Sequence, residues 1–141
     1  MKLHINNCDS SVEHSEGYCV DIPEGSSEYT FLHFLTPALV KTSTGLTEVE
    51  PGACVMYSPH NPQYYRGAGE RWSNDHLTFS GTSSEKIVLT GGFSLNEVFY
   101  PYRTHYIASL FEKMKTETLR RELNWDRVST LELDEFILKL S

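Results

Sequence analysis

The sequence lacks most of the features that mark secreted and membrane-spanning proteins. It has three cysteines, Cys8, Cys19 and Cys54, which are odd in number and include no Cys-X-X-Cys pair. Free thiols in a reducing cytoplasm are the simplest interpretation of this pattern. There is no apolar run long enough for a membrane-spanning helix. The N-terminal residues also lack the apolar core of a signal peptide, so we expect a cytoplasmic protein that does not contact the membrane.

Basic residues are scarce relative to acidic ones. The chain of 141 residues has 12 Lys and Arg against 19 Asp and Glu, a formal net charge of -7. Because nucleic acid binding depends on neutralising phosphates with Lys and Arg, this balance argues against direct contact of the chain with DNA or RNA. The length and a hydrophobic content of 39% predict one domain with its own core.

Motifs for metal binding and nucleophilic catalysis are missing as well. Metal-dependent β-barrel enzymes need two neighbouring histidines and a carboxylate on one strand, and a third histidine on a later strand. None of the six histidines here forms a His-X-His pair, and His60 lies in a Pro-rich corner. Ser58 precedes a proline instead of lying in a Gly-X-Ser-X-Gly turn. We therefore expect no metal, no cofactor and no catalytic residue.

Short β-type segments separated by Gly and Pro fill the first hundred residues. Residues 1–16 are polar and read as a flexible arm. Alternating or β-branched runs then predict short strands, at residues 18–22, 29–35, 38–41, 46–49, 53–57, 64–66, 72–79 and 86–90. Many short strands at close spacing are typical of a sandwich or barrel, so the predicted fold class is mainly β.

The composition changes after Pro101, because residues 102–141 contain no Gly and no Pro. Apolar residues at spacings of three and four predict two helices, with the faces Ile107, Leu110, Phe111 and Met114, and Leu133, Phe136, Ile137 and Leu140. The join is expected near residues 124–126, with Ser129 or Thr130 as a cap and Glu132 as the partner of Ser129 in a capping box. The first face either covers the barrel or pairs with its counterpart in a homodimer.

The densest polar and aromatic chemistry lies between Glu50 and Gly81. Trp72, Asn74 and His76 are spaced by two, which places their side chains on one face of a strand, either toward the interior or toward solvent. Of the adjacent Tyr64 and Tyr65, only one should face inward.

His33 lies in the middle of an apolar strand. It is either a core histidine with hydrogen-bond partners or a group that points into a ligand cavity.

Four segments together resemble a known family. They are residues 31–37 (FLHFLTP), 51–65 (PGACVMYSPHNPQYY), 71–81 (RWSNDHLTFSG) and 93–101 (FSLNEVFYP), followed by two helices. In order and spacing they resemble the N-terminal sensing domain of AraC-type (arabinose-regulator-like) transcription regulators, over about residues 18–141. The resemblance implies a cupin-like double-stranded β-helix or jelly-roll barrel that binds an effector, often a sugar, in residues 1–100. It implies a helical dimerisation or linker region in residues 101–141.

The resemblance also implies a helix-turn-helix DNA-binding domain, which would begin where this chain ends and would make the DNA contact. Residue by residue, the family's effector-contacting positions fall on Tyr65, Asn74 and His76. An inward-facing position falls near Leu35, which would place His33 and Phe31 on the same inner face. Gln63 stands where many cupins have a metal-binding histidine.

The prediction from sequence is therefore an effector-sensing and dimerisation domain of a transcription regulator that acts in the cytoplasm. The predicted ligand-binding residues are His33, Leu35, Tyr65, Trp72, Asn74 and His76, and the predicted dimer contacts are Ile107, Leu110, Phe111 and Met114. The predicted partners are a small-molecule effector and a second copy of the chain. Two alternatives stay open: a small cupin enzyme such as an isomerase or dioxygenase, and a domain that only dimerises around a vestigial pocket.

Overall fold

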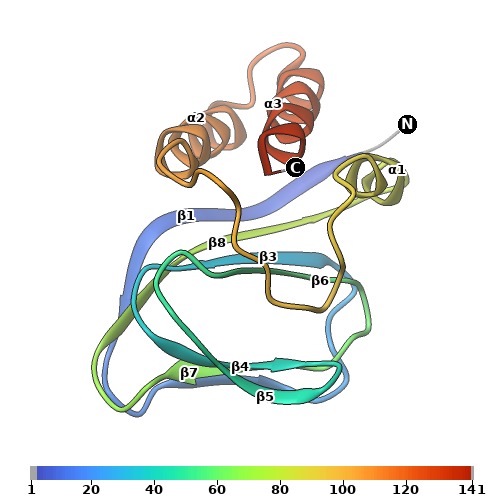
Figure 1. The fold of residues 1–141 in the computed structure, drawn as a ribbon. Helices are drawn as coiled ribbons and strands as arrows, with labels where there is room; N and C mark the ends of the chain where they lie inside the picture. Colours follow the sequence, from blue (N-terminus) through green and yellow to red (C-terminus); the bar gives the residue numbers. More distant parts are fainter. Residues whose placement is uncertain (1–2, 141) are drawn as a thin grey trace.

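Two antiparallel four-stranded sheets lie face to face in the computed structural model, which describes residues 3–140 (Figure 1). The first sheet has the order β1 (His4–His14), β8 (Trp72–Ser80), β3 (Tyr29–Phe34) and β6 (Cys54–Tyr57). The second has the order β2 (Cys19–Ile22), β7 (Gln63–Gly67), β4 (Ala38–Thr42) and β5 (Gly45–Val49). Except for β4 to β5, each strand is followed in the chain by one in the other sheet. The mainly β prediction is confirmed.

Three helices follow the last strand: α1 (Ser84–Leu89), α2 (Ile107–Arg120) and α3 (Trp125–Leu140). Figure 1 shows α2 and α3 side by side on the outer face of the first sheet. The two predicted C-terminal helices are thus present. No helix among residues 3–140 is long and apolar enough to cross a membrane.

The first sheet buries apolar side chains on both of its faces. In β3, Phe31 packs toward the helices with Phe111 and Phe136, at ring-centroid distances of 6.1 and 4.9 Å. The neighbouring Leu32 and Phe34 point the other way, into the core between the sheets. Side-chain alternation along a strand thus explains why the run from Tyr29 to Phe34 is buried at every position.

The predicted dimer contacts lie inside this chain. Ile107, Leu110, Phe111 and Met114 are at most 3% exposed and belong to the core that the helices form on the first sheet. The structure therefore favours the other reading of this helix face, in which it covers the barrel. These four side chains are therefore too buried to contact a second chain.

Three local predictions were wrong. The strand β1 lies wholly within the expected flexible arm, and its pairing with β8 shifts register between Ile5 and Asn7 and between Asp9 and Val12. These irregularities break the alternation that would have revealed a strand. The expected strand at residues 86–90 is largely the helix α1, since Val88 packs into the helix-covered core. The helix α3 begins at Trp125, one turn before the expected caps.

Candidate functional site

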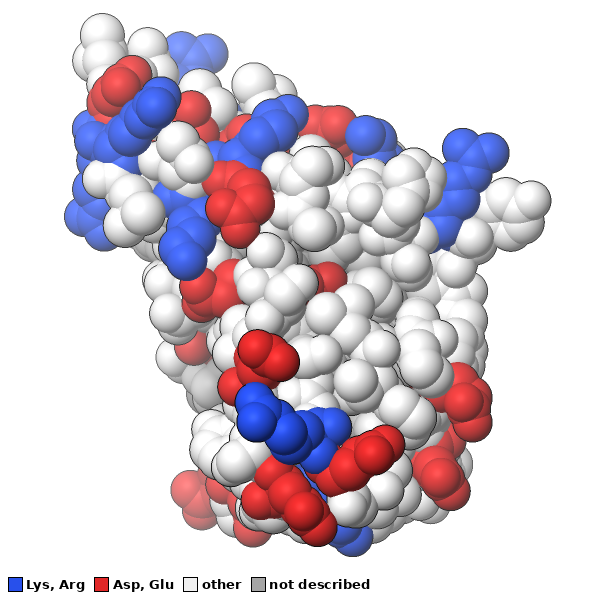
Figure 2. Space-filling view, turned by 90° about the vertical axis from the view of Figure 1, so that its left-hand side faces the viewer, with Lys and Arg blue, Asp and Glu red and all other residues white. Residues whose placement is uncertain are grey.

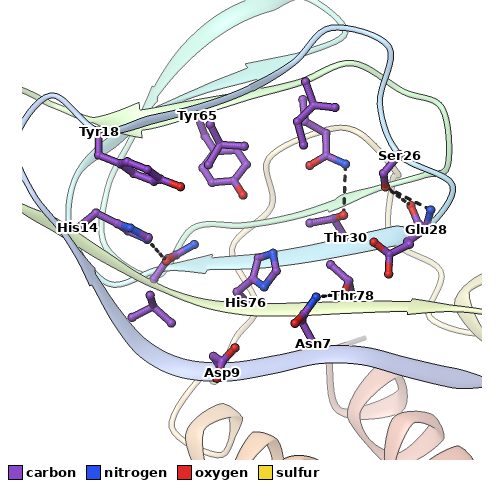
Figure 3. A pocket seen from close by; sticks show the side chains of 15 residues that line it. Asn7, Asp9, His14, Tyr18, Ser26, Glu28, Thr30, Tyr65, His76 and Thr78 are labelled. Atoms are coloured by element: carbon purple, nitrogen blue, oxygen red, sulfur yellow. Dashed lines mark hydrogen bonds between the residues drawn. The ribbon is translucent and has the colours of Figure 1, made fainter.

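A cavity of about 350 Å³ lies between the two sheets, on the side where β1, β2, β7 and β8 meet (Figure 3). Apolar side chains fill the space toward β4, β5 and β6. The cavity walls are mainly polar and aromatic, and the lining residues are Asn7, Asp9, Val12, His14, Tyr18, Val20, Ile22, Ser26, Glu28, Thr30, Gln63, Tyr65, Asn74, His76 and Thr78.

The strand β8 supplies one wall through three residues spaced by two. Asn74, His76 and Thr78 all line the cavity, as the alternation of strand side chains requires. Asn74 is only 2% exposed, and its Oδ1 accepts a hydrogen bond from His14 Nε2 at 3.0 Å. Thr78 Oγ1 accepts a hydrogen bond from Asn7 Nδ2 at 3.3 Å. These bonds hold the wall in a defined arrangement before any ligand binds.

His76 differs from its neighbours on this wall. No hydrogen bond to its imidazole is found within residues 3–140, and Figure 3 shows the ring pointing into the cavity. Burial lowers the pKa of His76, although the nearby carboxylates of Asp9 and Glu28 oppose that shift. The imidazole is therefore neutral near pH 7 and offers a ligand one donor and one acceptor.

The strand β7 supplies the opposite wall. Gln63 Nε2 donates a hydrogen bond to Thr30 Oγ1 at 3.2 Å, so this amide is already engaged within the protein. The Tyr65 ring is buried against Phe34, while its hydroxyl points toward the cavity (Figure 3). Burial raises the pKa of the Tyr65 phenol, so it stays protonated and can donate a hydrogen bond.

An aromatic cluster closes one end of the cavity. The rings of His14 and Tyr18 stack with centroids 4.8 Å apart, and Trp72 lies 4.2 Å from His14. Trp72 does not line the cavity; it packs behind Tyr65 at 6.0 Å, and its Nε1 donates a hydrogen bond to the Tyr18 carbonyl at 3.2 Å. Trp72 thus supports the wall that Tyr18 and Tyr65 present.

The predicted ligand-binding residues fall into two groups. Tyr65, Asn74 and His76 line the cavity and Trp72 lies directly behind them, so the interior reading of this face of β8 is the correct one. Leu35 follows the end of β3 and does not line the cavity.

The placement of His33 and Phe31 on the inner face was wrong, because both point toward the helices. His33 Nδ1 lies 2.7 Å from Asp75 Oδ2, and Asp75 Oδ1 accepts a hydrogen bond from the Ser11 N–H at 2.8 Å. His33 is thus the core histidine with hydrogen-bond partners.

Sequence analysis missed the part of the cavity that β1, β2 and the adjoining loops form. Asn7, Asp9, His14, Tyr18 and Glu28 all line it, yet most of them lie in or near the segment that reads as a flexible arm. The alternation of Tyr18, Val20 and Ile22 was the available signal, since all three face the cavity. The pairing of β1 and β3 with β8 and of β2 with β7 brings these residues to the site.

No group of three or more His, Cys, Asp or Glu side chains placed to hold a metal ion occurs among the described residues. His14 and His76 both line the cavity, but His14 is committed to Asn74. The donor set therefore differs from the two-histidine and carboxylate arrangement of a metal-dependent barrel enzyme.

Comparison with known proteins finds likeness to solved structures only, since no family model and no curated protein match. ToxT from Vibrio cholerae aligns at 12% identity and a TM-score of 0.48, over 99% of this chain and 53% of ToxT. The AraC-like transcriptional activator CuxR aligns at 14% identity and a TM-score of 0.43, over 91% of this chain and 46% of CuxR.

Two further structures show likeness at lower TM-scores. The Cupin_2 domain of an XRE family transcriptional regulator from Enterobacter cloacae aligns at 14% identity and a TM-score of 0.40, over 49% of this chain and 75% of that domain. The Streptomyces albus protein HEPD, whose structure holds Fe(II) and 2-hydroxyethylphosphonate, aligns at 16% identity and a TM-score of 0.36, over 99% of this chain and 44% of HEPD. The chain thus spans about half of ToxT, CuxR and HEPD. It is similar in fold to cupin-like domains of AraC-like and other transcription regulators.

Proposed function

We propose that this chain is the effector-sensing domain of an AraC-type transcription regulator and has no enzymatic activity of its own. The observation that carries the proposal is the cavity between the sheets, which combines polar walls with an aromatic end. Cavities of this size are typical binding sites for small molecules. A regulator of this kind acts in the cytoplasm, with DNA contacted by a separate helix-turn-helix domain.

The hydrogen bonds of the walls support recognition rather than catalysis. Side-chain hydrogen bonds join His14 to Asn74, Gln63 to Thr30 and Asn7 to Thr78. In each pair the bond fixes the orientation of both side chains. Nucleophilic catalysis by a Ser, Thr or Cys would need a general base within hydrogen-bond reach of that nucleophile. Among the hydrogen bonds between residues 3 and 140, none joins a lining histidine to a Ser, Thr or Cys side chain.

A route from the cavity to the helices supports a sensing role. Asp9 lines the cavity, and its Oδ1 accepts a hydrogen bond from Lys115 Nζ of α2 at 2.9 Å. The neighbouring Ser10 hydroxyl donates to Glu112 Oε1 of α2 at 2.9 Å, and Cys8 Sγ donates to the Phe111 carbonyl at 3.3 Å. A ligand that binds one arrangement of β1 more tightly than another would therefore also bias the position of α2.

The dimer that the family resemblance implies must use a different helix surface from the predicted one. Val128, Leu131 and Leu138 form an exposed apolar row on α3, which we call the outer α3 stripe, with exposed fractions of 36%, 69% and 56%. Their spacings of three and seven residues place them on one side of the helix. We propose that the stripe contacts its counterpart in a homodimer.

A thermal-shift screen of neutral, anionic and cationic metabolites, followed by calorimetric titration of each compound that raises the Tm, tests the sensing function. We expect at least one compound to bind, and His76→Ala to weaken its binding because the imidazole points into the cavity. His105→Ala is the matched control, since His105 is exposed and lies outside the cavity.

Two results would contradict the proposal. A screen in which no compound stabilises the protein would leave the cavity without a ligand. Stoichiometric iron, manganese or zinc in the purified protein, together with turnover of a substrate, would favour the cupin enzyme instead.

A further inference from the structure

The Asp, Glu, Lys and Arg residues that line the cavity are all of one sign. Its fifteen lining residues include two carboxylates, Asp9 and Glu28, and neither Lys nor Arg. A site for a carboxylate or phosphate would normally present Arg or Lys to the ligand. The wall of this cavity therefore disfavours an anionic ligand.

The two carboxylates differ in how their charge is balanced. Asp9 pairs with Lys115 of α2 at 2.9 Å. Glu28 forms no ion pair with any Lys or Arg of residues 3–140; the side-chain group that bonds its carboxylate is the neutral amide of Asn6. The Ser26 hydroxyl fixes the Glu28 backbone by hydrogen bonds to both its N–H and its carbonyl, each 3.2 Å long. A half-buried carboxylate is thus held at the cavity without a cationic partner.

The end of the cavity opposite Glu28 suits the apolar part of a ligand. Figure 3 shows Tyr18 and Tyr65 at that end and Glu28 at the other. The tyrosine faces and the Val20 side chain, which pairs with Tyr65 across β2 and β7, provide apolar surface. Aromatic faces also attract cations, so no part of this wall repels a positive charge.

We propose that the cavity binds an organic ammonium ion, with the ammonium group on the Glu28 carboxylate and an aryl or alkyl part against Tyr18 and Tyr65. This inference rests on the proposed sensing function and specifies the chemical class of the effector. A charge-assisted hydrogen bond to an otherwise unpaired carboxylate provides the selectivity for ammonium over a hydroxyl group.

Binding of such a ligand should weaken at acidic pH. His76 faces the cavity together with Asp9 and His14 of β1, Glu28 from the loop before β3, and Tyr65 of β7. Because its pKa lies below the ordinary 6.5, His76 is neutral at pH 7 and becomes positively charged only in more acidic solution. An ammonium ion would then meet a like charge, so its affinity falls as the pH drops through that pKa, and His76→Gln removes this part of the pH dependence.

Calorimetric titration with three probes of one skeleton tests the proposal: phenylpropylamine, phenylpropanol and phenylpropanoate. We expect the amine to bind about tenfold more tightly than the alcohol, and the carboxylate not to bind. Glu28→Gln should weaken amine binding about tenfold and leave alcohol binding unchanged. Glu24→Gln is the matched control, because Glu24 is exposed and lies outside the cavity.

The other possible results decide against the ammonium proposal, the sensing function or both. If the alcohol or the carboxylate binds more tightly than the amine, the ammonium proposal is wrong. The same holds if Glu28→Gln and the unchanged protein bind the amine equally well. In both cases the cavity still binds a small molecule, so the sensing function stands. If none of the three probes binds but a metabolite without an ammonium group does, the ammonium proposal fails and the sensing function stands. If nothing binds, both fail. Should Glu28→Gln not fold, the preference among the three probes in the unchanged protein still decides.

Discussion

His33 illustrates how a single residue in an apolar strand can serve stability rather than binding. Its imidazole is 5% exposed and contacts Asp75, which is 2% exposed and also accepts the Ser11 N–H. Ser11 has a left-handed backbone with φ of 53° and lies in the irregular part of β1 that lines the cavity through Asp9 and Val12. The His33–Asp75 pair therefore joins β3, β8 and the irregular turn of β1.

Replacing His33 by alanine should lower the free energy of unfolding by about 2–3 kcal/mol, because the Asp75 carboxylate would lose its side-chain partner while staying buried. Urea denaturation followed by circular dichroism measures this loss. His105→Ala, at an exposed position, should change stability by less than about 0.5 kcal/mol. If His33→Ala and His105→Ala change the free energy of unfolding equally, the His33–Asp75 pair contributes nothing to stability.

At the scale of elements, the turn between β2 and β3 positions one end of the cavity. Gly25 has a φ of +69°, and the next residue, Ser26, accepts a hydrogen bond from the His60 N–H at 2.7 Å through its carbonyl. A Cβ on Gly25 would lie 2.4 Å from the Asn61 carbonyl oxygen. Only glycine fits at position 25. The turn that contains it sets the position of Glu28.

Gly25→Ala should therefore destabilise the protein more than Gly17→Ala does. Gly17 shares the positive φ, at +86°, but a Cβ there meets nothing within 4 Å. Backbone strain alone predicts a loss of about 1–2 kcal/mol for Gly17→Ala, and the added contact with Asn61 a larger loss for Gly25→Ala. Chemical denaturation compares the two, and equal losses would mean that the loop holding Asn61 moves aside at no cost.

The helix α3 carries a carboxylate that opposes folding. Glu132 is 8% exposed, and its Oε1 finds no hydrogen-bond partner among residues 3–140. Burial raises the pKa of Glu132 above its ordinary 4.5, while Lys113 counteracts the rise. Since the folded state then binds the proton more tightly than the unfolded state, stability is lost as the pH rises from about 4.5 through the raised value.

Glu132→Gln should accordingly increase the Tm at pH 7, and the increase should vanish near pH 4, where the carboxyl is protonated in both states. Glu135→Gln is the opposite control on the same helix. Its hydrogen bond with Lys139 lowers the pKa of Glu135, so this side chain stabilises the folded state above the ordinary pKa and less in acid. A lower Tm for Glu132→Gln at pH 7 would contradict the argument.

The whole molecule divides its charge between the barrel and the helices. Twelve of the 19 acidic residues but only five of the 12 basic ones precede Pro101, so residues 101–141 carry no formal net charge. In Figure 2, most of the visible Lys and Arg side chains lie over the helical end, while Asp and Glu predominate over the barrel. In the proposed homodimer, two copies would therefore meet the least repulsion through their helices, where the outer α3 stripe lies.

Leu131→Glu should weaken the proposed homodimer at least about tenfold, because it places a charge in the centre of the outer α3 stripe. Sedimentation velocity over a range of concentrations gives the dissociation constant. Leu46→Glu is the control, since Leu46 is also exposed, at 53%, but lies on β5 of the barrel. If the unchanged protein sediments as a monomer even at high concentration, the homodimer proposal is wrong.

The hydrophobic periodicity of the sequence predicted most of the strands and helices that bury only one face. The periodicity of Leu110 and Met114 identified α2, and the spacing of Asn74 and His76 identified one wall of the cavity. It failed for β1, where two register shifts hide the alternation, and for α1, where tertiary packing of Val88 overrides β-branched composition. It could not choose between the two faces of β3, because both are buried.

The amino-acid sequence by itself determined a mainly β domain followed by two helices, and a group of polar and aromatic residues on one strand face, since hydrophobic periodicity and turn residues are local properties. Only the tertiary structure decided which of those residues share a cavity and what charge surrounds them. Glu28 and Asp9 are distant in sequence from Tyr65 and His76, and the pairing of β1 and β3 with β8, together with the packing of the two sheets, brings them to one cavity. Strand pairing between distant segments depends on the packing of the whole core, which no local pattern reports.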